Sequence, residues 1–123
     1  MEAAALIGDW EVTAFLNGVV LGPPLPGTRI TARFADDGSI SGSTACNVYR
    51  GSYFLDGEEI RIQPPAATRK ACLSPEGVME QEAAYLASLP TAVRFRIEEG
   101  ILELFAADGT FVASYSRLEE PPN

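Results

Sequence analysis

Short runs of alternating apolar and polar residues, separated by acid-glycine pairs, constrain the fold of this chain more than any other feature. The alternation is clear where Ile30, Ala32 and Phe34 are interleaved with Thr31 and Arg33. A period of two indicates β-strands with one buried and one exposed face. The pairs between the runs are typical of tight hairpin turns; they are Asp37-Gly38, Asp56-Gly57, Glu99-Gly100 and Asp108-Gly109.

This pattern predicts about eight strands, at residues 10–16, 29–35, 39–45, 47–55, 58–63, 92–97, 100–106 and 110–117. A sheet of strands joined mostly by tight turns leaves exposed edges unless it curls and closes. We therefore expect a mainly β fold, an antiparallel barrel-like meander. Residues 17–28 are rich in proline and glycine, which predicts a surface loop with only a short edge strand at Val19 and Val20.

Residues 74–90, SPEGVMEQEAAYLASLP, carry a helical pattern instead. Ser74 is a candidate N-cap and Pro75 suits the first helical position, so we expect a helix at about 75–89 that Pro90 ends. Its apolar positions form one stripe: Val78, Tyr85 and Leu89, with Met79 and Leu86 beside them. This stripe predicts that the helix packs on the barrel or plugs one end of it.

Glu82 would lie on or beside this apolar stripe, four residues after Val78 and three before Tyr85. A carboxylate in that position needs a partner. Arg69 and Lys70 are the nearest cations in sequence, and a backbone amide or a tyrosine hydroxyl would also serve. A structural tether is favoured over a catalytic acid, because a buried carboxylate usually persists through its hydrogen bonds.

Composition indicates one compact folding unit. A chain of 123 residues with 46% hydrophobic side chains can bury one core, so we expect a single domain over residues 1–123. Its core would span about 6–117 and a short disordered tail 119–123. Seventeen acidic against nine basic side chains give a net charge of −8, which disfavours nucleic acid as a partner. We expect a monomer.

The chain contains no apolar run of the roughly 18 residues that a transmembrane segment needs, and its opening lacks the pattern of a signal peptide. It also contains no histidine, which removes the commonest general base and most zinc and copper sites. Calcium-loop and phosphate-binding glycine motifs are absent from the sequence as well. We therefore predict no metal, no cofactor and no catalytic residue.

Cys46 and Cys72 are the remaining chemical feature. Each lies at the end of a strand-like segment, and the hairpin between them could bring them together. A disulfide would close a loop of about 27 residues and contribute about 3 kcal/mol, whereas two buried free thiols are the alternative. A catalytic Cys46 is disfavoured, because without histidine its activation would rest on Arg69, Lys70 or a helix end.

Asn47, Tyr49, Gly51 and Tyr53 alternate on one face of a predicted strand. If that face points inward, the interior holds an amide and two phenols, either as a polar network or as a ligand pocket. We favour a structural polar network and add further members to it, so that the candidate set is Asn47, Tyr49, Tyr53, Thr68 and Glu82. Gly51 suits a tight bend that leaves room for a neighbouring ring.

Taken together, these residues resemble the META domain, also called the HslJ-like family, over almost the whole chain. The matching positions are Leu6, Gly8, Trp10, Gly42, Cys46, Asn47, Tyr49, Gly51, Tyr53, Thr68, Cys72, Met79, Glu82, Tyr85, Leu86, Leu102 and Leu104. The resemblance implies a compact antiparallel barrel-like domain with one helix. It also implies that Cys46 and Cys72 are neighbours and that Glu82 occupies the helical acid position of the family.

The resemblance further implies a non-enzymatic domain of the bacterial envelope or of a stress response. Members are often lipoproteins and are associated with heat shock, antibiotic tolerance or motility. We therefore expect binding of an unidentified protein or small molecule, in the periplasm, on an outer-membrane lipoprotein or in a secreted protein. The export or lipobox segment of an envelope member is missing from this sequence, so a cytoplasmic location stays open.

Two other functions remain open from the residues. One is a lipocalin-like binder that holds a small ligand inside the barrel with Tyr49, Tyr53 and the helix stripe. A core filled by large side chains would count against it, and the expected ones are Trp10, Phe34, Tyr53 and Phe95. The other is a thiol or redox-active protein that uses Cys46 and Cys72.

Overall fold

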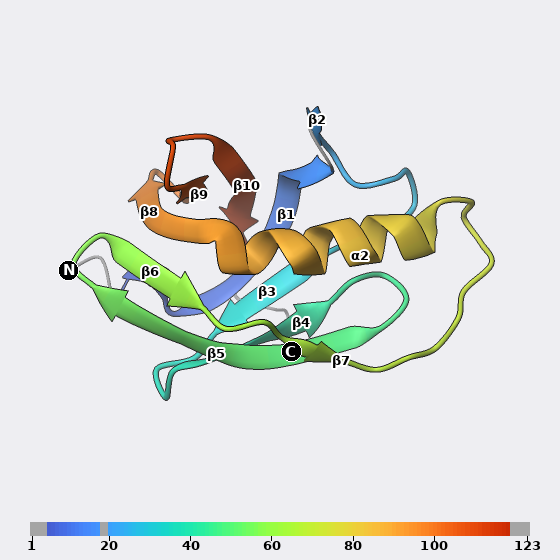
Figure 1. Ribbon diagram of the computed structural model, residues 1–123, viewed down its shortest axis with the longest axis horizontal. Helices are drawn as coiled ribbons and strands as arrows, with labels where there is room; N and C mark the ends of the chain where they lie inside the picture. The colour runs from blue at the N-terminus through green and yellow to red at the C-terminus, as the bar shows by residue number, and fades with distance from the viewer. Residues whose placement is uncertain (1–4, 18–19, 119–123) are drawn as a thin grey trace.

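The strand β1 pairs with β3 on one side and with β10 on the other, and this double pairing closes the sheet into a barrel. The computed structural model describes residues 5–17 and 20–118. Around the barrel the antiparallel strands follow the order β10, β9, β8, β6, β5, β4, β3, β1, as Figure 1 shows. Their bounds are β1 Gly8–Asn17, β3 Thr31–Phe34, β4 Ser39–Ser43, β5 Val48–Asp56, β6 Glu59–Ile62, β8 Ala92–Glu98, β9 Ile101–Ala106 and β10 Phe111–Arg117.

The predicted antiparallel barrel of about eight strands is confirmed, and no predicted strand boundary is wrong by more than two residues. Two short strands lie outside the closed ring: β2 (Val20–Gly22) pairs with β1, and β7 (Ala66–Ala67) pairs with β5. The first contains Val20 of the predicted edge strand. Val19 and the predicted tail at 119–123 lie outside the described residues. A two-residue strand such as β7 has no period, so the sequence could not indicate it.

Large side chains fill the barrel. Trp10 and Phe34 are fully buried, Phe95 and Tyr53 nearly so, and all four belong to one hydrophobic cluster. The Phe34 and Tyr53 rings meet edge to face with their centroids 5.2 Å apart, an arrangement that aromatic pairs prefer. This filled interior counts against a lipocalin-like binding cavity.

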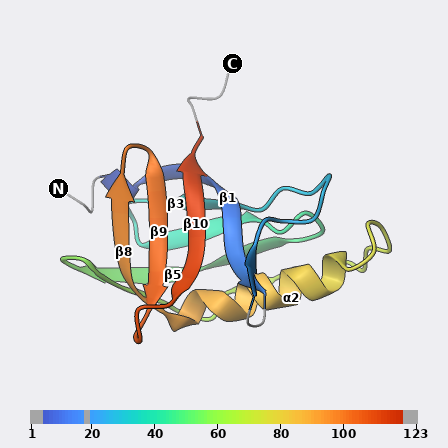
Figure 2. The same cartoon turned by 90° about the horizontal axis from the view of Figure 1, so that it is seen from above.

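The helix α2 (Val78–Ser88) runs into a short 3-10 turn, η1 (Leu89–Thr91), and lies across one end of the barrel (Figure 2). The predicted start at Ser74 and Pro75 is wrong. Gly77 precedes the first helical residue with φ of 90°, which is left-handed backbone that cannot continue a right-handed helix. The helix therefore begins about three residues later than predicted, without a side-chain cap.

One face of α2 is buried against the barrel, as the stripe predicts. Tyr85 is fully buried, and its ring packs edge to face on Phe15 of β1 at 6.0 Å and on Tyr49 of β5 at 5.7 Å. Polar Gln81 and Glu82 are buried on the same face, so the end of the barrel is closed by hydrogen bonds as well as by apolar contact. Among the described residues, none of the helices has the length and apolar character needed to cross a membrane.

Two glycines mark places where backbone segments approach each other closely. A Cβ atom on Gly42 would lie 2.0 Å from the carbonyl oxygen of Thr31 and 2.9 Å from the Tyr49 hydroxyl. A Cβ atom on Gly51 would lie 3.3 Å from Cα and Cβ of Pro65, so Pro65 is the residue that occupies the room beside Gly51. The close approach of β4 to Thr31 and of β5 to Pro65 therefore depends on missing side chains.

We predict that Gly42→Ala lowers the free energy of unfolding by at least about 2 kcal/mol, because the added methyl group would overlap the Thr31 carbonyl. Urea unfolding followed by circular dichroism measures this. Gly22→Ala is the matched control, since no atom lies within 4 Å of its Cβ position, and its effect should stay below about 0.5 kcal/mol. Equal effects of the two substitutions would contradict the close approach.

Candidate functional site

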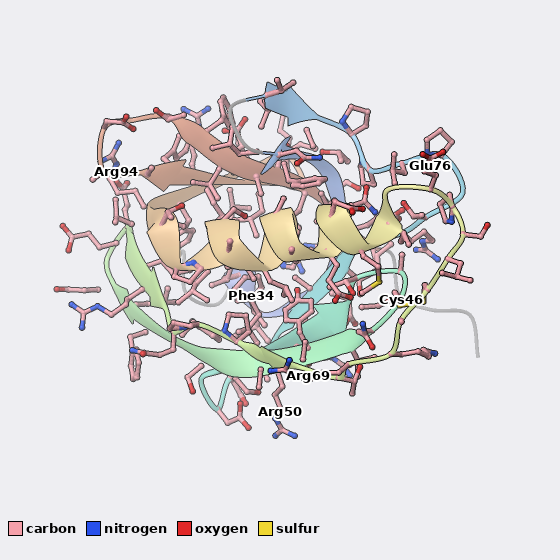
Figure 3. All side chains as sticks on the ribbon, turned by 45° about the vertical axis from the view of Figure 1, so that its right-hand side comes forward. Phe34, Cys46, Arg50, Arg69, Glu76 and Arg94 are labelled. Carbon is pink, nitrogen blue, oxygen red and sulfur yellow. A yellow bond between two sulfur atoms is a disulfide. The ribbon has the colours of Figure 1, made fainter. Side chains whose placement is uncertain are left out.

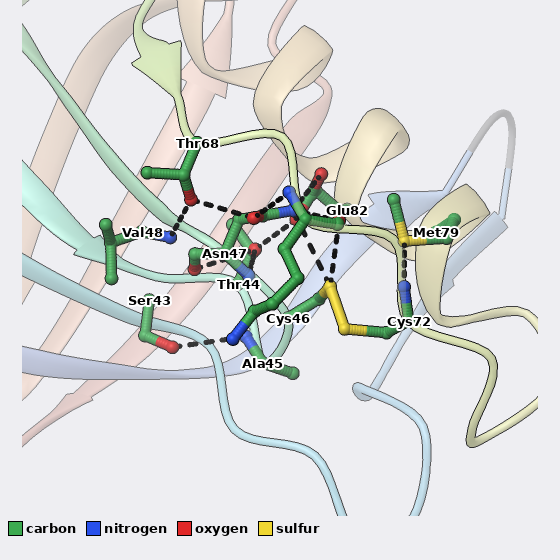
Figure 4. The surroundings of a disulfide bond; sticks show 11 residues. Ser43, Thr44, Ala45, Cys46, Asn47, Val48, Thr68, Cys72, Met79 and Glu82 are labelled. Carbon is green, nitrogen blue, oxygen red and sulfur yellow. Dashed lines mark hydrogen bonds between the residues drawn. A yellow bond between two sulfur atoms is a disulfide. The ribbon is translucent and has the colours of Figure 1, made fainter.

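The Cys46 and Cys72 side chains form a disulfide that joins the turn between β4 and β5 to the segment that leads into α2. The two cysteines are 26 residues apart in sequence, and their Cα atoms are 6.0 Å apart. The predicted proximity is confirmed, and of the two alternatives the structure contains the disulfide rather than free thiols. Figure 4 shows that a polar network surrounds this bond.

The Asn47 side chain is the centre of this network and is 3% exposed. Its Nδ2 donates to Glu82 Oε1 at 2.9 Å and to the Lys70 carbonyl oxygen at 3.0 Å. Its Oδ1 accepts from the Thr68 hydroxyl at 2.7 Å and from the Lys70 backbone N–H at 2.8 Å. Two donors and two acceptor positions are all that an asparagine amide offers. Every one of them is used, and they join three separate segments of the chain.

Glu82 is 8% exposed and accepts hydrogen bonds from two neutral groups. Besides Asn47, its Oε1 lies 2.5 Å from the Thr44 hydroxyl, which donates to it. The predicted cationic partners are wrong: in the described part of the chain neither Arg69 nor Lys70 forms an ion pair with Glu82. The reason is that segment 68–70 turns its backbone toward Asn47, while the Arg69 and Lys70 side chains are exposed.

Tyr49, also placed in the candidate network, belongs to a separate chain of hydroxyl groups. Its hydroxyl donates to the Thr31 carbonyl oxygen at 2.7 Å and lies 2.9 Å from the Tyr85 hydroxyl, which lies 3.0 Å from that of Tyr115. Each phenol has one proton. Because Tyr49 gives its proton to Thr31, Tyr85 must donate to Tyr49 and Tyr115 must donate to Tyr85.

The remaining member, Tyr53, lies apart from both groups. Its hydroxyl donates to the Ala35 carbonyl oxygen at 2.6 Å. The structure thus brings Asn47, Thr68 and Glu82 together beside the disulfide, and it places Tyr49 and Tyr53 elsewhere. Sequence reasoning missed Thr44 and Tyr115. A threonine two residues before Cys46 could have indicated the first. The position of Tyr115 two residues after Ala113, on the same inward face, could have indicated the second.

Gln81 makes a further contact that the sequence did not indicate. Its Oε1 accepts from the Leu25 backbone N–H at 2.7 Å, and its Nε2 donates to the Thr28 hydroxyl at 3.2 Å. The helix therefore holds the proline-rich loop as well as the disulfide segment. Within the described residues every buried side-chain nitrogen or oxygen has a hydrogen-bond partner, and no three metal-ligating side chains are grouped as in a metal site. These contacts hold the segments around the helix in place.

A shallow groove lies on the outer face of the barrel beside this network, over β4, β5 and β7. Its volume is about 620 Å³. Apolar atoms come from Val48, which is 58% exposed, and from Ala66, whereas Ser41, Ser43 and Arg50 add polar groups. Thr68 connects the groove to the network, because its hydroxyl donates to Asn47 and accepts from the Val48 N–H at 3.1 Å.

The sequence matches the family model described as the META domain over residues 4–118. No curated protein sequence matches significantly. Among solved structures, the chain is similar to an NMR structure of a protein from Burkholderia xenovorans, with a TM-score of 0.75 and 24% identity over 96% of this chain and 87% of that one. It is also similar to the crystal structure of a DUF4847 family protein from Bacteroides vulgatus ATCC 8482, with a TM-score of 0.65 and 13% identity over 93% and 94% of the two chains. These structural similarities support the fold alone.

We predict that Glu82→Gln lowers the free energy of unfolding by about 1–2 kcal/mol. The new amide would place an NH2 group against Asn47 Nδ2, a donor facing a donor, and the charge-assisted character of the bonds would be lost. Denaturant unfolding at neutral pH measures this. Glu80→Gln on the exposed side of the same helix is the matched control, with an expected change below about 0.5 kcal/mol. A fully stable Glu82→Gln protein would contradict the role of Glu82 as a tether.

The buried phenols predict a loss of stability at alkaline pH. Burial raises the pKa of Tyr49, Tyr85 and Tyr115 above the ordinary value, whereas tyrosines of the unfolded chain titrate near pH 10. Since the folded pKa values are the higher ones, this contribution to stability is fully present below about pH 10 and is lost as the pH rises above it. We expect the free energy of unfolding to fall by about 1.4 kcal/mol per pH unit for each phenol.

Urea unfolding at a series of pH values, with phenolate absorbance recorded in parallel, checks this dependence. Tyr85→Phe is the comparison, because it removes one buried phenol. The dependence of its unfolding free energy on pH should be shallower by the contribution of one phenol. Ionisation of these tyrosines near pH 10 while the protein stays folded would show that the prediction is wrong.

Proposed function

The chain belongs to the META domain family, and from that premise we propose that it is a non-enzymatic binding domain. The groove over β4, β5 and β7 is its binding surface, and the partner is a protein or a small molecule. The single observation that carries this proposal is the exposed Val48 in a groove of about 620 Å³, beside an exposed Arg50. An apolar surface flanked by a few polar groups is the usual composition of a binding site.

The filled barrel and the satisfied network support an external surface over an internal one. Trp10 and Phe34 occupy the interior of the barrel. A lipocalin-like binder needs an empty interior, so this filled core disfavours that alternative. Asn47 and Glu82 hold each other and their neighbours in place, so neither side chain has a free position toward a substrate. Binding without chemistry is the function that agrees with both observations.

We also propose an extracytoplasmic, stress-associated role, in the periplasm, on an outer-membrane lipoprotein or in a secreted protein. The Cys46–Cys72 disulfide supports this location, because such bonds persist in oxidising compartments and are rare in the cytoplasm. Cell fractionation with alkylation of free thiols tests it. We expect the protein outside the cytoplasm with both cysteines protected, and a reduced protein in the cytoplasmic fraction would contradict the proposal.

A second candidate function is redox sensing, and the same disulfide favours it. Cys46 is 7% exposed and Cys72 is half-buried, so a thiolate would have to approach from the Cys72 side. A Cys46→Ser/Cys72→Ser protein decides between the candidates. If this variant loses stability but keeps groove binding, the disulfide is structural. Groove binding is also measured on the natural protein with and without reductant, and a change in binding on reduction would favour redox sensing.

The binding proposal is tested by titrating a library of small organic fragments into the 15N-labelled protein and recording amide shifts. We expect hits to concentrate on Val48, Arg50 and Ala67. Val48→Glu should abolish these hits without lowering stability, because Val48 is exposed. Leu73→Glu is the matched control, since Leu73 is 94% exposed and lies outside the groove residues. Hits scattered over the surface, or shifts centred on interior residues, would contradict the proposal.

A further inference from the structure

We propose that the ligand of this groove is a saccharide that carries carboxylate groups. It is bound by Arg50 in the groove and by Arg33 on the adjoining strand β3, on either side of Ser41. This inference rests on the proposed function, because it names the ligand class of the same surface. It is carried by the order of side chains across the outer face of β1, β3, β4 and β5, by the hydrogen-bonding groups left free there, and by the apolar atoms beside them.

The strand register places the two arginines in one row. Asp9 pairs with Arg33, Arg33 with Ser41, Ser41 with Arg50, and Arg50 with Ala66. Paired residues of neighbouring strands share a face of the sheet, and this face is the outer one because the next row contains the buried Trp10 and Ala32. Two strand spacings put the Cα atoms of Arg33 and Arg50 about 10 Å apart, a span that two long guanidinium side chains can close over Ser41.

Both guanidinium groups keep donors for an anion. Arg33 contacts Asp9 through Nε at 3.2 Å, and its side chain is 67% exposed. Within the described residues its two terminal nitrogens donate no hydrogen bond, so they remain available. Arg50 forms no ion pair within the described residues, and Figure 3 shows it pointing outward from β5. The carboxylate that competes for it is Asp37, whose pKa is lowered mainly by hydrogen bonds from Ser39 and in small part by Arg50. A planar guanidinium binds a carboxylate through two parallel hydrogen bonds.

Hydroxyl groups on the same face provide the contacts that a polyol needs. The hydroxyl oxygen of Ser43 accepts from the Ala45 N–H at 3.2 Å, and that of Thr31 accepts from the Ser43 N–H at 3.0 Å. Each of these hydroxyls therefore still has its own proton to donate. Ser41, between the arginines, has no side-chain hydrogen bond within the described residues. Donors of this kind match the hydroxyl and ring oxygens of a sugar.

The apolar part of the groove matches the rest of a sugar. Val48, Ala66 and Ala67 line it with aliphatic carbon, and the C–H face of a pyranose ring is apolar enough to lie on such a surface. A nucleic acid does not fit this site, because the net charge of −8 repels a long polyanion. A short ligand with one or two carboxylates meets the local arginines at close range instead.

The test is a titration of the 15N-labelled protein with trigalacturonate, its methyl ester and triglutamate. Trigalacturonate should shift the amides of Ser41, Ser43 and Val48 and bind about tenfold more tightly than the methyl ester, which has the same rings without charge. Equal affinity for the ester, tighter binding of triglutamate, or no saturable shift at this face would each overturn the inference, and the second result would assign the face to acidic peptides.

Arg50→Gln should weaken trigalacturonate binding about tenfold, and Arg50→Lys, which keeps the charge but loses the paired donors, should weaken it by less. Arg94→Gln is the matched control. Arg94 is exposed on β8 and lies well away from Arg50 in Figure 3, so binding should be unchanged, and an equal loss would overturn the inference. If neutral fragments bind the groove and trigalacturonate does not, the saccharide assignment fails while the proposed function stands; if neither binds there, both fail.

Discussion

The fully used amide of Asn47 is the interaction on which the arrangement of this molecule depends. It holds Glu82 of the helix, the hydroxyl of Thr68 and both backbone groups of Lys70 at once. A buried carboxylate without donors is costly, so Glu82 fixes the helix only where Asn47 and Thr44 can reach it. The disulfide at the neighbouring Cys46 restricts the same segments covalently. Two independent restraints thus meet at one end of the barrel.

The tyrosine chain extends this restraint into the barrel. Tyr85 comes from the helix, and its hydroxyl lies between those of Tyr49 on β5 and Tyr115 on β10. Strand β10 pairs with β1 where the sheet closes. The tyrosine chain therefore connects the helix to β10 at this closure and to β5 elsewhere in the barrel. The same Thr68 that binds Asn47 borders the outer groove. The position of one wall of the proposed binding surface is therefore set by the buried network.

The sequence predicts the elements of this structure better than the contacts between them. Alternation and acid-glycine turns are local signals, and they located the strands of the barrel. The sequence misplaces the start of the helix, because Ser74 and Pro75 look like a capping pair whereas the left-handed backbone of Gly77 sets the first helical residue at Val78. The partners of Glu82 depend on which side of segment 68–70 faces inward, and the row through Arg33 and Arg50 depends on register across strands. Neither is encoded in a local pattern.

A double-mutant cycle between Asn47→Ala and Glu82→Ala tests the central claim most directly. Unfolding free energies of the natural chain, the two single variants and the double variant give the coupling between the two side chains. If the buried amide and carboxylate hold the helix to the turn between β4 and β5, the coupling energy should be about 1–2 kcal/mol. Effects that add to within about 0.3 kcal/mol would show that the two groups act independently and that this pair does not hold the helix to the turn.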